Sequence, residues 1–276
     1  MLPRLIGVTA VLLAAYVAYL SLLFVVQRRV MYPGAQATPR SASPEAIRHG
    51  VESLWLSTSS GEVEAWYLPA ASTVERGPAA VVFHGNAELA LDSAAVLAHL
   101  SELGVAALYV EYPGYGRSAG SPSENSIVDA ATVGYDWLVA RPDVDSERVF
   151  ALGRSLGAGV AAGLAQHRPV AALVLWSPFV SVGYLALRSY GAPPFLARDR
   201  YDTRRVLSTF GRPVLIFHGN RDQVIPYHHA TVLAAAGKAA TLVSWDCGHN
   251  DCPPSWRELW DPLTSFLQAN RLLGHR

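Results

Sequence analysis

The sequence predicts an α/β fold in which a mainly parallel sheet of eight strands is covered by helices on both faces. Short β-rich runs alternate with helical stretches from Ala80 onward, which is the pattern of a doubly wound sheet. The runs AAVVF, VAALYV and PVLIF are apolar on successive residues, as expected for strands that are buried on both sides. A long uncharged segment at the N-terminus adds a predicted membrane helix.

Residues 1–26 form the predicted membrane anchor. From Leu5 to Val26 the chain has 22 residues without a charge, about 33 Å of helix, and the apolar core of a bilayer is about 30 Å thick. A cleaved signal peptide is the alternative, with Ala35-Gln36-Ala37 as its cleavage pattern. The apolar run exceeds the usual signal core of about 7 to 15 residues, so we expect a single-pass membrane protein held by residues 5–26.

The orientation of this anchor follows weakly from its flanking charges. Arg4 and the free amine precede the span, whereas Arg28, Arg29 and Arg40 follow it. The positive-inside rule therefore weakly favours placing the domain that follows the anchor on the cytoplasmic side.

Residues 27–50, which contain three prolines, are expected to be an irregular linker, and residues 51–276 a single domain. Expected strands are 51–58, 63–68, 80–83, 105–110, 148–152, 172–176, 214–217 and 241–245, the first two antiparallel. Expected helices are 88–103, 124–140, 155–167, 226–236 and 255–271. The long connection at about 177–212 is rich in aromatic residues and is interpreted as a small lid over the active site.

The strongest local motif is Gly153-Arg154-Ser155-Leu156-Gly157, directly after the strand RVFAL and before the helical run AGVAAGLAQH. Glycines on either side permit a strained strand-to-helix turn that exposes the serine, and the helix N-terminus favours developing negative charge. The motif therefore indicates that Ser155 is a catalytic nucleophile.

A serine nucleophile needs a base and an acid, which follow it in the order acid then histidine in folds of this kind. Asp222 lies in HGNRD after the strand VLIF, and His249 lies in DCGHN after the strand TLVSW. We expect His249 to take the proton from Ser155 and Asp222 to orient the imidazole.

Other residues near these positions are less suitable. Histidines at strand ends are usually structural, and histidines early in a helix lack the expected loop position. Acidic residues adjacent to His249 in sequence rarely direct their side chains towards it. These competitors are His84, His218, His228, His229, Asp246 and Asp251. Cys247 and Cys252, the only cysteines, are expected to be two small buried thiols, although a disulfide would indicate an oxidising compartment.

The third requirement is an oxyanion hole made of two backbone N–H groups. Leu156, directly after the nucleophile, supplies the first. The second is expected from His84-Gly85-Asn86-Ala87, where the glycine permits a close approach of the backbone, and Asn86 is preferred over Ala87.

The composition excludes one class of partner and favours another. Lys+Arg and Asp+Glu both number 22, so the net charge is zero, and no basic surplus exists to bind nucleic acid. Charged residues are 16% of the chain, below the usual quarter. Apolar surface is therefore expected to face lipid or an acyl-type ligand.

Five segments together resemble the α/β-hydrolase superfamily: HGNA at 84–87, EYPGYGRSAGSPSE at 111–124, GRSLGAG at 153–159, RPVLIFHGNRDQVIP at 212–226 and CGHND at 247–251. Within it the chain is similar to the bud-emergence (Bem) type hydrolases, the α/β-hydrolase-domain depalmitoylases and the serine-aminopeptidase-like lipases. The resemblance implies ester or thioester hydrolysis, with Ser155, Asp222 and His249 as the triad. The cysteine-rich N-terminal tract of the depalmitoylases is missing, which argues against protein depalmitoylation.

These patterns predict a membrane-anchored serine hydrolase that cleaves carboxylic esters or thioesters through an acyl-enzyme on Ser155. Neither a metal nor an organic cofactor is expected, and the expected partner is a small-molecule or lipid acyl ester. A lipid or acylglycerol hydrolase is the alternative within enzymes. A catalytically silent hydrolase fold that serves as a binding protein is the alternative of another class.

Overall fold

The computed structural model describes residues 2–37, 50–71 and 75–274. Within them eight strands form one sheet in the order β1-β2-β4-β3-β5-β6-β7-β8. The first two pairings, β1 with β2 and β2 with β4, are antiparallel, and all others are parallel. The predicted fold class is therefore confirmed. The strands are β1 (Glu52–Thr58), β2 (Gly61–Leu68), β3 (Gly77–Phe83), β4 (Ala106–Val110), β5 (Val144–Arg154), β6 (Leu173–Trp176), β7 (Val214–Gly219) and β8 (Ala240–Trp245).

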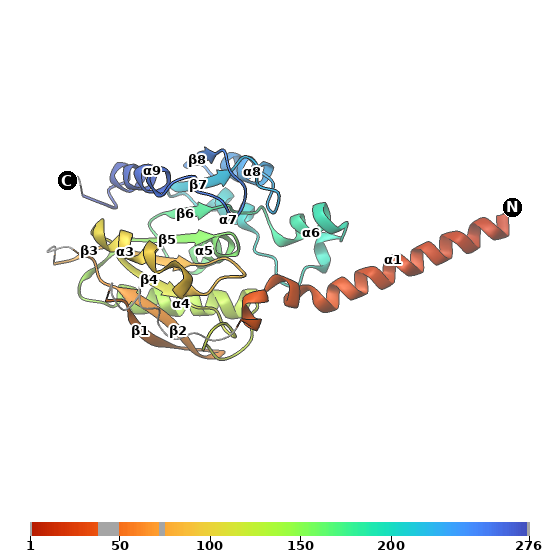
Figure 1. Cartoon of the computed structure of the whole chain (residues 1–276), viewed down its shortest axis with the longest axis horizontal. Helices are drawn as coiled ribbons and strands as arrows, with labels where there is room; N and C mark the ends of the chain where they lie inside the picture. Colours follow the sequence, from red (N-terminus) through yellow and green to blue (C-terminus); the bar gives the residue numbers. More distant parts are fainter. Residues whose placement is uncertain (1, 38–49, 72–74, 275–276) are drawn as a thin grey trace.

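Helices cover both faces of this sheet (Figure 1). Successive strand residues point to opposite faces, so Val81 of β3 packs into one apolar core and Val82 into the other. The first core contains side chains of α4 (Glu124–Val139), α5 (Leu156–His167) and α8 (His228–Ala236), and the second those of α3 (Ala94–Glu102) and α9 (Trp256–Ala269). This two-sided burial explains the uninterrupted apolar runs of the strands.

The strand register brings three loops to one edge of the sheet. Arg154 at the end of β5 pairs with Trp176 of β6, which pairs with Phe217 of β7, and Gly219 pairs with Trp245 at the end of β8. Because these strands are parallel, the loops after β5, β7 and β8 leave the sheet side by side.

The N-terminal helix α1 (Leu2–Met31) extends from the rest of the molecule (Figure 1). Its segment Leu5–Met31 is long and apolar enough to cross a membrane, and it is the one helix of this kind among the described residues. The helix continues past Val26 to Met31, and the 3-10 helix η1 (Pro33–Gln36) follows it. The predicted linker is thus helical where it begins, whereas its residues 38–49 lie outside the described part of the chain.

Between β6 and β7 the chain forms two short helices that the sequence interpretation missed. The β6–β7 insertion (residues 177–212) contains α6 (Val182–Tyr190), the 3-10 helix η3 (Pro194–Leu196) and α7 (Thr203–Thr209). Ser181 caps α6 by accepting the Tyr184 N–H, and Asp202 caps α7 by accepting the Arg205 N–H. These caps satisfy backbone donors at each helix start, so the aromatic-rich segment is locally ordered.

Candidate active site

Ser155 occupies the turn between β5 and α5. Its φ of 53° and ψ of −114° are rare for a residue with a side chain and cost conformational energy. The turn persists because the backbone is tightly packed there: a Cβ on Gly157 would lie 2.2 Å from the carbonyl oxygen of Phe83. Glycine is therefore required at 157, and the serine side chain is held at the rim of the sheet.

The two predicted partners of Ser155 lie within hydrogen-bond distance in series. His249 Nε2 is 3.1 Å from Ser155 Oγ, and His249 Nδ1 is 2.7 Å from Asp222 Oδ2. The Asp222 side chain is fully buried, and that of His249 is 9% exposed. The structure thus brings together three residues that are far apart in sequence, with a continuous path for a proton between the serine and the imidazole.

The Asp222 carboxylate is held by the backbone as well as by the imidazole. Its Oδ1 accepts hydrogen bonds from the N–H groups of Val224 and Ile225, at 2.9 and 2.7 Å. Burial by itself would raise the pKa of Asp222, but the hydrogen bonds from His249 and Ile225 outweigh it, so this pKa lies below its ordinary value. Asp222 is therefore a charged acceptor that favours the His249 tautomer with its proton on Nδ1.

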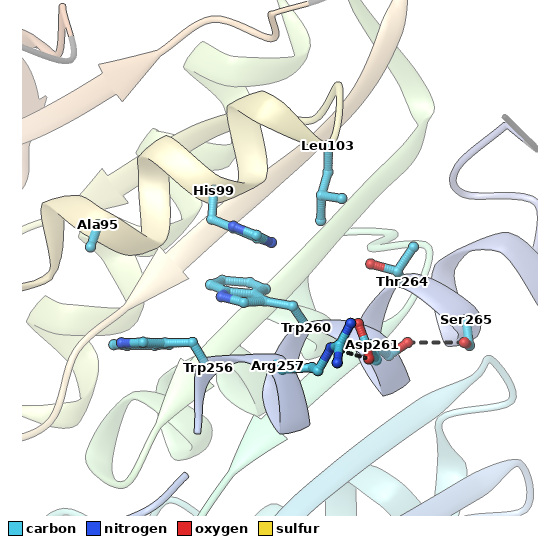
Figure 2. A pocket seen from close by; sticks show the side chains of 9 residues that line it. All are labelled: Ala95, His99, Leu103, Trp256, Arg257, Trp260, Asp261, Thr264 and Ser265. Atoms are coloured by element: carbon cyan, nitrogen blue, oxygen red, sulfur yellow. Dashed lines mark hydrogen bonds and ion pairs between the residues drawn. The ribbon is translucent and has the colours of Figure 1, made fainter. Parts of the chain in front are cut away.

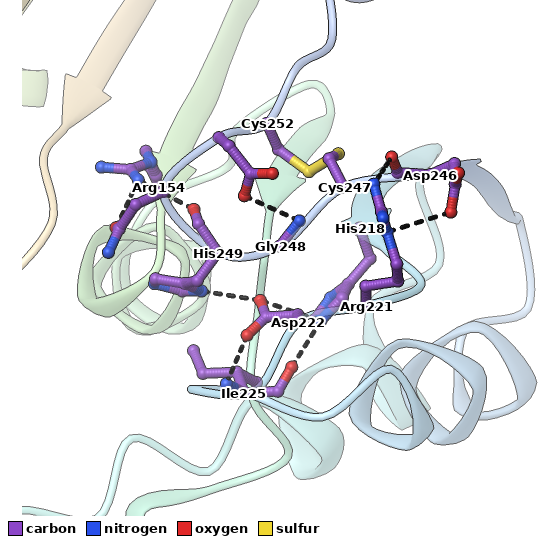
Figure 3. The surroundings of a disulfide bond; sticks show 12 residues. Arg154, His218, Arg221, Asp222, Ile225, Asp246, Cys247, Gly248, His249 and Cys252 are labelled. Carbon is purple, nitrogen blue, oxygen red and sulfur yellow. Dashed lines mark hydrogen bonds and ion pairs between the residues drawn. A yellow bond between two sulfur atoms is a disulfide. The ribbon is translucent and has the colours of Figure 1, made fainter.

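The loop that carries His249 is closed by a disulfide between Cys247 and Cys252 (Figure 3). The expectation of two free thiols was wrong. Both cysteines are buried, and the turn between them brings their Cα atoms within 5.5 Å, a separation that a disulfide readily bridges. Sequence proximity alone could not reveal this turn.

Arg154, the residue before Ser155, was not predicted to have a role. Its guanidinium donates to the backbone carbonyl of His249 at 3.1 Å and forms an ion pair with Glu88. Burial lowers the pKa of Arg154, although the Asp222 charge opposes the shift. Glu88 in turn accepts the Gly85 N–H at 2.9 Å. Arg154 thus links the His249 loop to the glycine turn after β3.

Both predicted oxyanion-hole residues lie beside Ser155. Leu156 begins α5, and Gly85, Asn86 and Leu156 line the same cavity as the serine. The N–H groups of Asn86 and Leu156 have no acceptor among the residues that the structure describes, so they are available to a ligand. The Asn86 side chain donates to Met31 O at 3.0 Å, which fixes the turn from the N-terminal side.

The competing residues make contacts other than a hydrogen bond to Ser155. His84 is buried against Glu111, with Nε2 2.7 Å from Oε1. His218 lies against the triad acid, with Nε2 3.5 Å from Asp222 Oδ2, and donates from Nε2 to the carbonyl of Ile225. His229 Nδ1 accepts the N–H of Val180. Near His249 itself, Asp246 is largely exposed. Within the described part of the chain, the side chain that is hydrogen-bonded to Ser155 Oγ is that of His249.

A cavity of about 510 Å³ opens at Ser155, which is within the ordinary size range of small-molecule sites. Its lining joins the catalytic candidates to apolar side chains of α1 and α6. A second hollow of about 730 Å³ lies between α3 and α9, around the stacked His99 and Trp260 rings (Figure 2). The two share no lining residue, so the second is not part of this site.

Comparisons with known proteins agree with the fold described above. A family model described as serine aminopeptidase, S33, matches residues 76–210. An uncharacterised protein of Mycobacterium tuberculosis is 34% identical over 255 residues, covering 90% of this chain and 89% of that protein. The α/β-hydrolase domain-containing protein WAV2 of Arabidopsis thaliana is 29% identical, covering 91% of each chain. The esterase Pf2001 of Pyrococcus furiosus has the same fold, with a TM-score of 0.68 at 17% identity, covering 84% of this chain and 94% of its own. The chain therefore belongs to the α/β-hydrolase superfamily.

Proposed function

We propose that this protein is a membrane-anchored serine hydrolase that cleaves carboxylic ester or thioester bonds through an acyl-enzyme on Ser155. One observation carries the proposal: the Ser155–His249–Asp222 series, with separations of 3.1 and 2.7 Å. This spacing suits proton transfer from a hydroxyl to an oriented imidazole.

The reaction proceeds in two halves. Ser155 Oγ attacks the acyl carbon and gives its proton to His249 Nε2, while the N–H groups of Leu156 and Asn86 stabilise the oxyanion. His249 then protonates the departing alcohol or thiol, which leaves the acyl group on Ser155. Water attacks this ester, His249 takes its proton, and the acid departs as the proton returns to the Ser155 oxygen.

The test uses the full chain in detergent. Ser155→Ala is expected to abolish hydrolysis of short p-nitrophenyl esters and labelling by a fluorophosphonate probe, because both need the Oγ nucleophile. Ser208→Ala, at an exposed serine of α7, is the matched control and should retain both. Retained labelling in Ser155→Ala would reject the nucleophile, and a folded wild-type protein that is never labelled would favour the binding-protein alternative.

The membrane anchor is part of the same proposal. Its support is the exposure of α1, whose residues 5–19 are solvent-accessible on all sides, as expected for a helix that faces lipid. Carbonate-resistant association with membranes and an intact N-terminus are the expected results. Recovery of a soluble chain that lacks residues 1–37 would instead indicate a cleaved signal peptide.

A second candidate activity, hydrolysis of lipid or acylglycerol esters, is favoured by the apolar lining that α1 and α6 give to the cavity. Rates for short-chain and long-chain esters in detergent micelles distinguish the two. A lipid hydrolase should prefer the long chain, because the additional methylenes are buried against the cavity wall.

A further inference from the structure

The cavity at Ser155 is built partly from the N-terminal helix. Seven α1 residues line it, and their recurring spacing of three and four residues places them on one side of the helix. They are Leu20, Leu23, Phe24, Val26, Gln27, Val30 and Met31. A helix that served only as a tether would have no reason to present one face to the catalytic residues.

The end of α1 is also bonded to the glycine turn that carries the proposed oxyanion donor. Met31 O accepts the Asn86 side-chain N–H at 3.0 Å. Just past the helix, the Gly34 N–H donates to Asn86 O at 3.1 Å, and Tyr115 donates to the same oxygen at 2.8 Å. The position of the helix therefore bears directly on the geometry at Ser155.

Polar contacts fasten α1 to the β6–β7 insertion along its length. Tyr16 and Tyr19 donate to the carbonyls of Gly191 and Tyr190 at 2.8 and 2.9 Å. Gln27 donates to Leu196 O at 3.2 Å and accepts the N–H of Arg198 at 2.8 Å. The helix and the insertion thus form a single wall on this side of the cavity.

The part of the wall nearest the N-terminus lies within the proposed membrane span. Leu20, Leu23, Phe24 and Val26 belong both to residues 5–26 and to the cavity lining. From Leu20 to Val26 the helix rises about 9 Å, so the cavity borders the bilayer over that depth.

The insertion offers a matching apolar surface. Leu187, Tyr190 and Phe195 are 46%, 54% and 77% exposed. They lie in the two elements, α6 and η3, that contact α1. Exposed large apolar side chains gathered beside a membrane helix are expected to enter the lipid interface.

From these contacts we infer that α1 is a structural wall of the active site and that the substrate enters from the bilayer: the acyl chain of a membrane-resident ester passes between α1 and α6 and lies along the Leu20–Met31 face, with its ester carbonyl at Ser155. The inference rests on the proposed hydrolase function. It assigns an acyl-chain site to α1 and restricts the natural substrate to long-chain esters dissolved in the membrane.

The first test compares two tryptophan substitutions on α1 in the full chain, reconstituted in phospholipid nanodiscs. Leu23→Trp fills the cavity face, whereas Val25→Trp adds the same bulk to a residue that is 73% exposed and does not line the cavity. The measurement is the ratio of kcat/KM for p-nitrophenyl palmitate to that for p-nitrophenyl butyrate. Leu23→Trp should lower this ratio about tenfold or more, since pocket contacts of this size carry that much discrimination, and Val25→Trp should leave it unchanged. An unchanged ratio in a folded Leu23→Trp protein would overturn the acyl-chain site.

The second test uses the wild-type chain, so it does not depend on how a variant folds. A fluorophosphonate with a hexadecyl chain ending in a diazirine is added to the nanodiscs, irradiated and mapped by peptide mass spectrometry. We expect the probe on Ser155 to be cross-linked to α1 between residues 20 and 31 or to α6. A cross-link found only on other elements would refute the inference while leaving the hydrolase proposal intact. Absence of the phosphonate from Ser155 would refute the hydrolase proposal itself.

Discussion

Asp222 performs two tasks with separate oxygens. Oδ1 accepts two backbone N–H groups of its own loop, and Oδ2 accepts from His249. An asparagine in the same rotamer would keep the backbone contacts and present an amide N–H to His249 Nδ1. The loop would be preserved, but the imidazole would be held in the tautomer that cannot take the serine proton.

Asp222→Asn is therefore expected to lower kcat for p-nitrophenyl butyrate by about 10³- to 10⁴-fold, with a melting temperature close to that of the wild type. Asp246→Asn is the control, because the Asp246 side chain is 77% exposed and pairs with Arg221 at the surface. The measurements are steady-state kinetics and differential scanning fluorimetry of both variants. A kcat that remained near the wild-type value in Asp222→Asn would assign the acid to another residue.

We expect the stability of the fold to depend on pH through His229. It is 2% exposed, and its Nδ1 accepts the Val180 N–H at 3.0 Å. Burial first, and then the neighbouring His218 and His228, lower the pKa of His229 to about 4. Below about pH 6.5 this histidine is protonated in the unfolded chain but remains neutral in the folded chain. The folded state therefore loses stability relative to the unfolded state as the pH falls towards 4.

At pH 5 this difference costs about 2 kcal/mol relative to pH 7.5. His229→Asn keeps an acceptor for the Val180 N–H and does not titrate, so the variant should lose about 2 kcal/mol less than the wild type over that range. The measurement is the free energy of unfolding in detergent at both pH values. Equal losses in the two proteins would contradict a neutral buried His229.

The strands were predictable because their patterns are local. Ala80–Phe83 and Val214–Phe217 are buried on both faces, and continuous apolar runs of this length are typical of parallel strands. The helices α6 and α7 were missed for a physical reason. Each is short and depends on contacts with distant elements, such as those of Tyr16 and Tyr19 with the end of α6, which no local periodicity contains.

The disulfide between Cys247 and Cys252 constrains the loop that carries His249. In the chain-entropy description, closing a loop of this length stabilises the folded state by about 2 kcal/mol. The double variant Cys247→Ser/Cys252→Ser should therefore have a lower melting temperature. It should also have a lower kcat, because His249 lies inside the closed loop. Titration with maleimide-polyethylene glycol should label the wild-type protein only after reduction. Labelling without reductant would show that the bond does not form.

This disulfide also bears on which side of the membrane the domain would occupy if α1 is the proposed anchor. Disulfides persist in oxidising compartments, which opposes the weak charge bias around α1 towards a cytoplasmic domain. The disulfide is the stronger of the two arguments and favours an oxidising compartment, because the bond that closes the proposed active-site loop is reduced in a reducing one. Protease accessibility in spheroplasts distinguishes the two orientations directly.

The site as a whole was predictable because topology fixes where the loops of a parallel sheet emerge. Ser155, Asp222 and His249 follow β5, β7 and β8, and the register of these strands ends at one edge. The contacts of Arg154 with Glu88, and those of Asn86 with Met31, had no comparable signal. These contacts join distant segments through side chains whose directions depend on the completed fold. The sequence therefore indicated the reactive groups but not the surrounding residues that hold them in position.

One buried acid contributes to the attachment of α1 to the rest of the molecule. Arg28 donates from Nε and one terminal nitrogen to the two oxygens of Asp199, at 2.8 and 2.9 Å. The Asp199 side chain is 2% exposed and also accepts the Glu124 N–H at 3.0 Å. Loss of the guanidinium would leave a buried carboxylate with too few donors, which is costly in a poorly solvated site.

Arg28→Leu is therefore expected to destabilise the protein by about 2 kcal/mol, a value reduced for the partial exposure of the arginine, and to lower the melting temperature by roughly 4 to 8 °C. Arg29→Leu removes the same charge from an exposed neighbour and should change neither stability nor activity. Because Met31 O holds Asn86, a loosened helix end should also reduce kcat for short esters in Arg28→Leu. Scanning fluorimetry and kinetics in detergent measure both effects. If Arg28→Leu matched Arg29→Leu in both, α1 would be an independent tether, and the proton path at Ser155 would have to be positioned by the sheet alone.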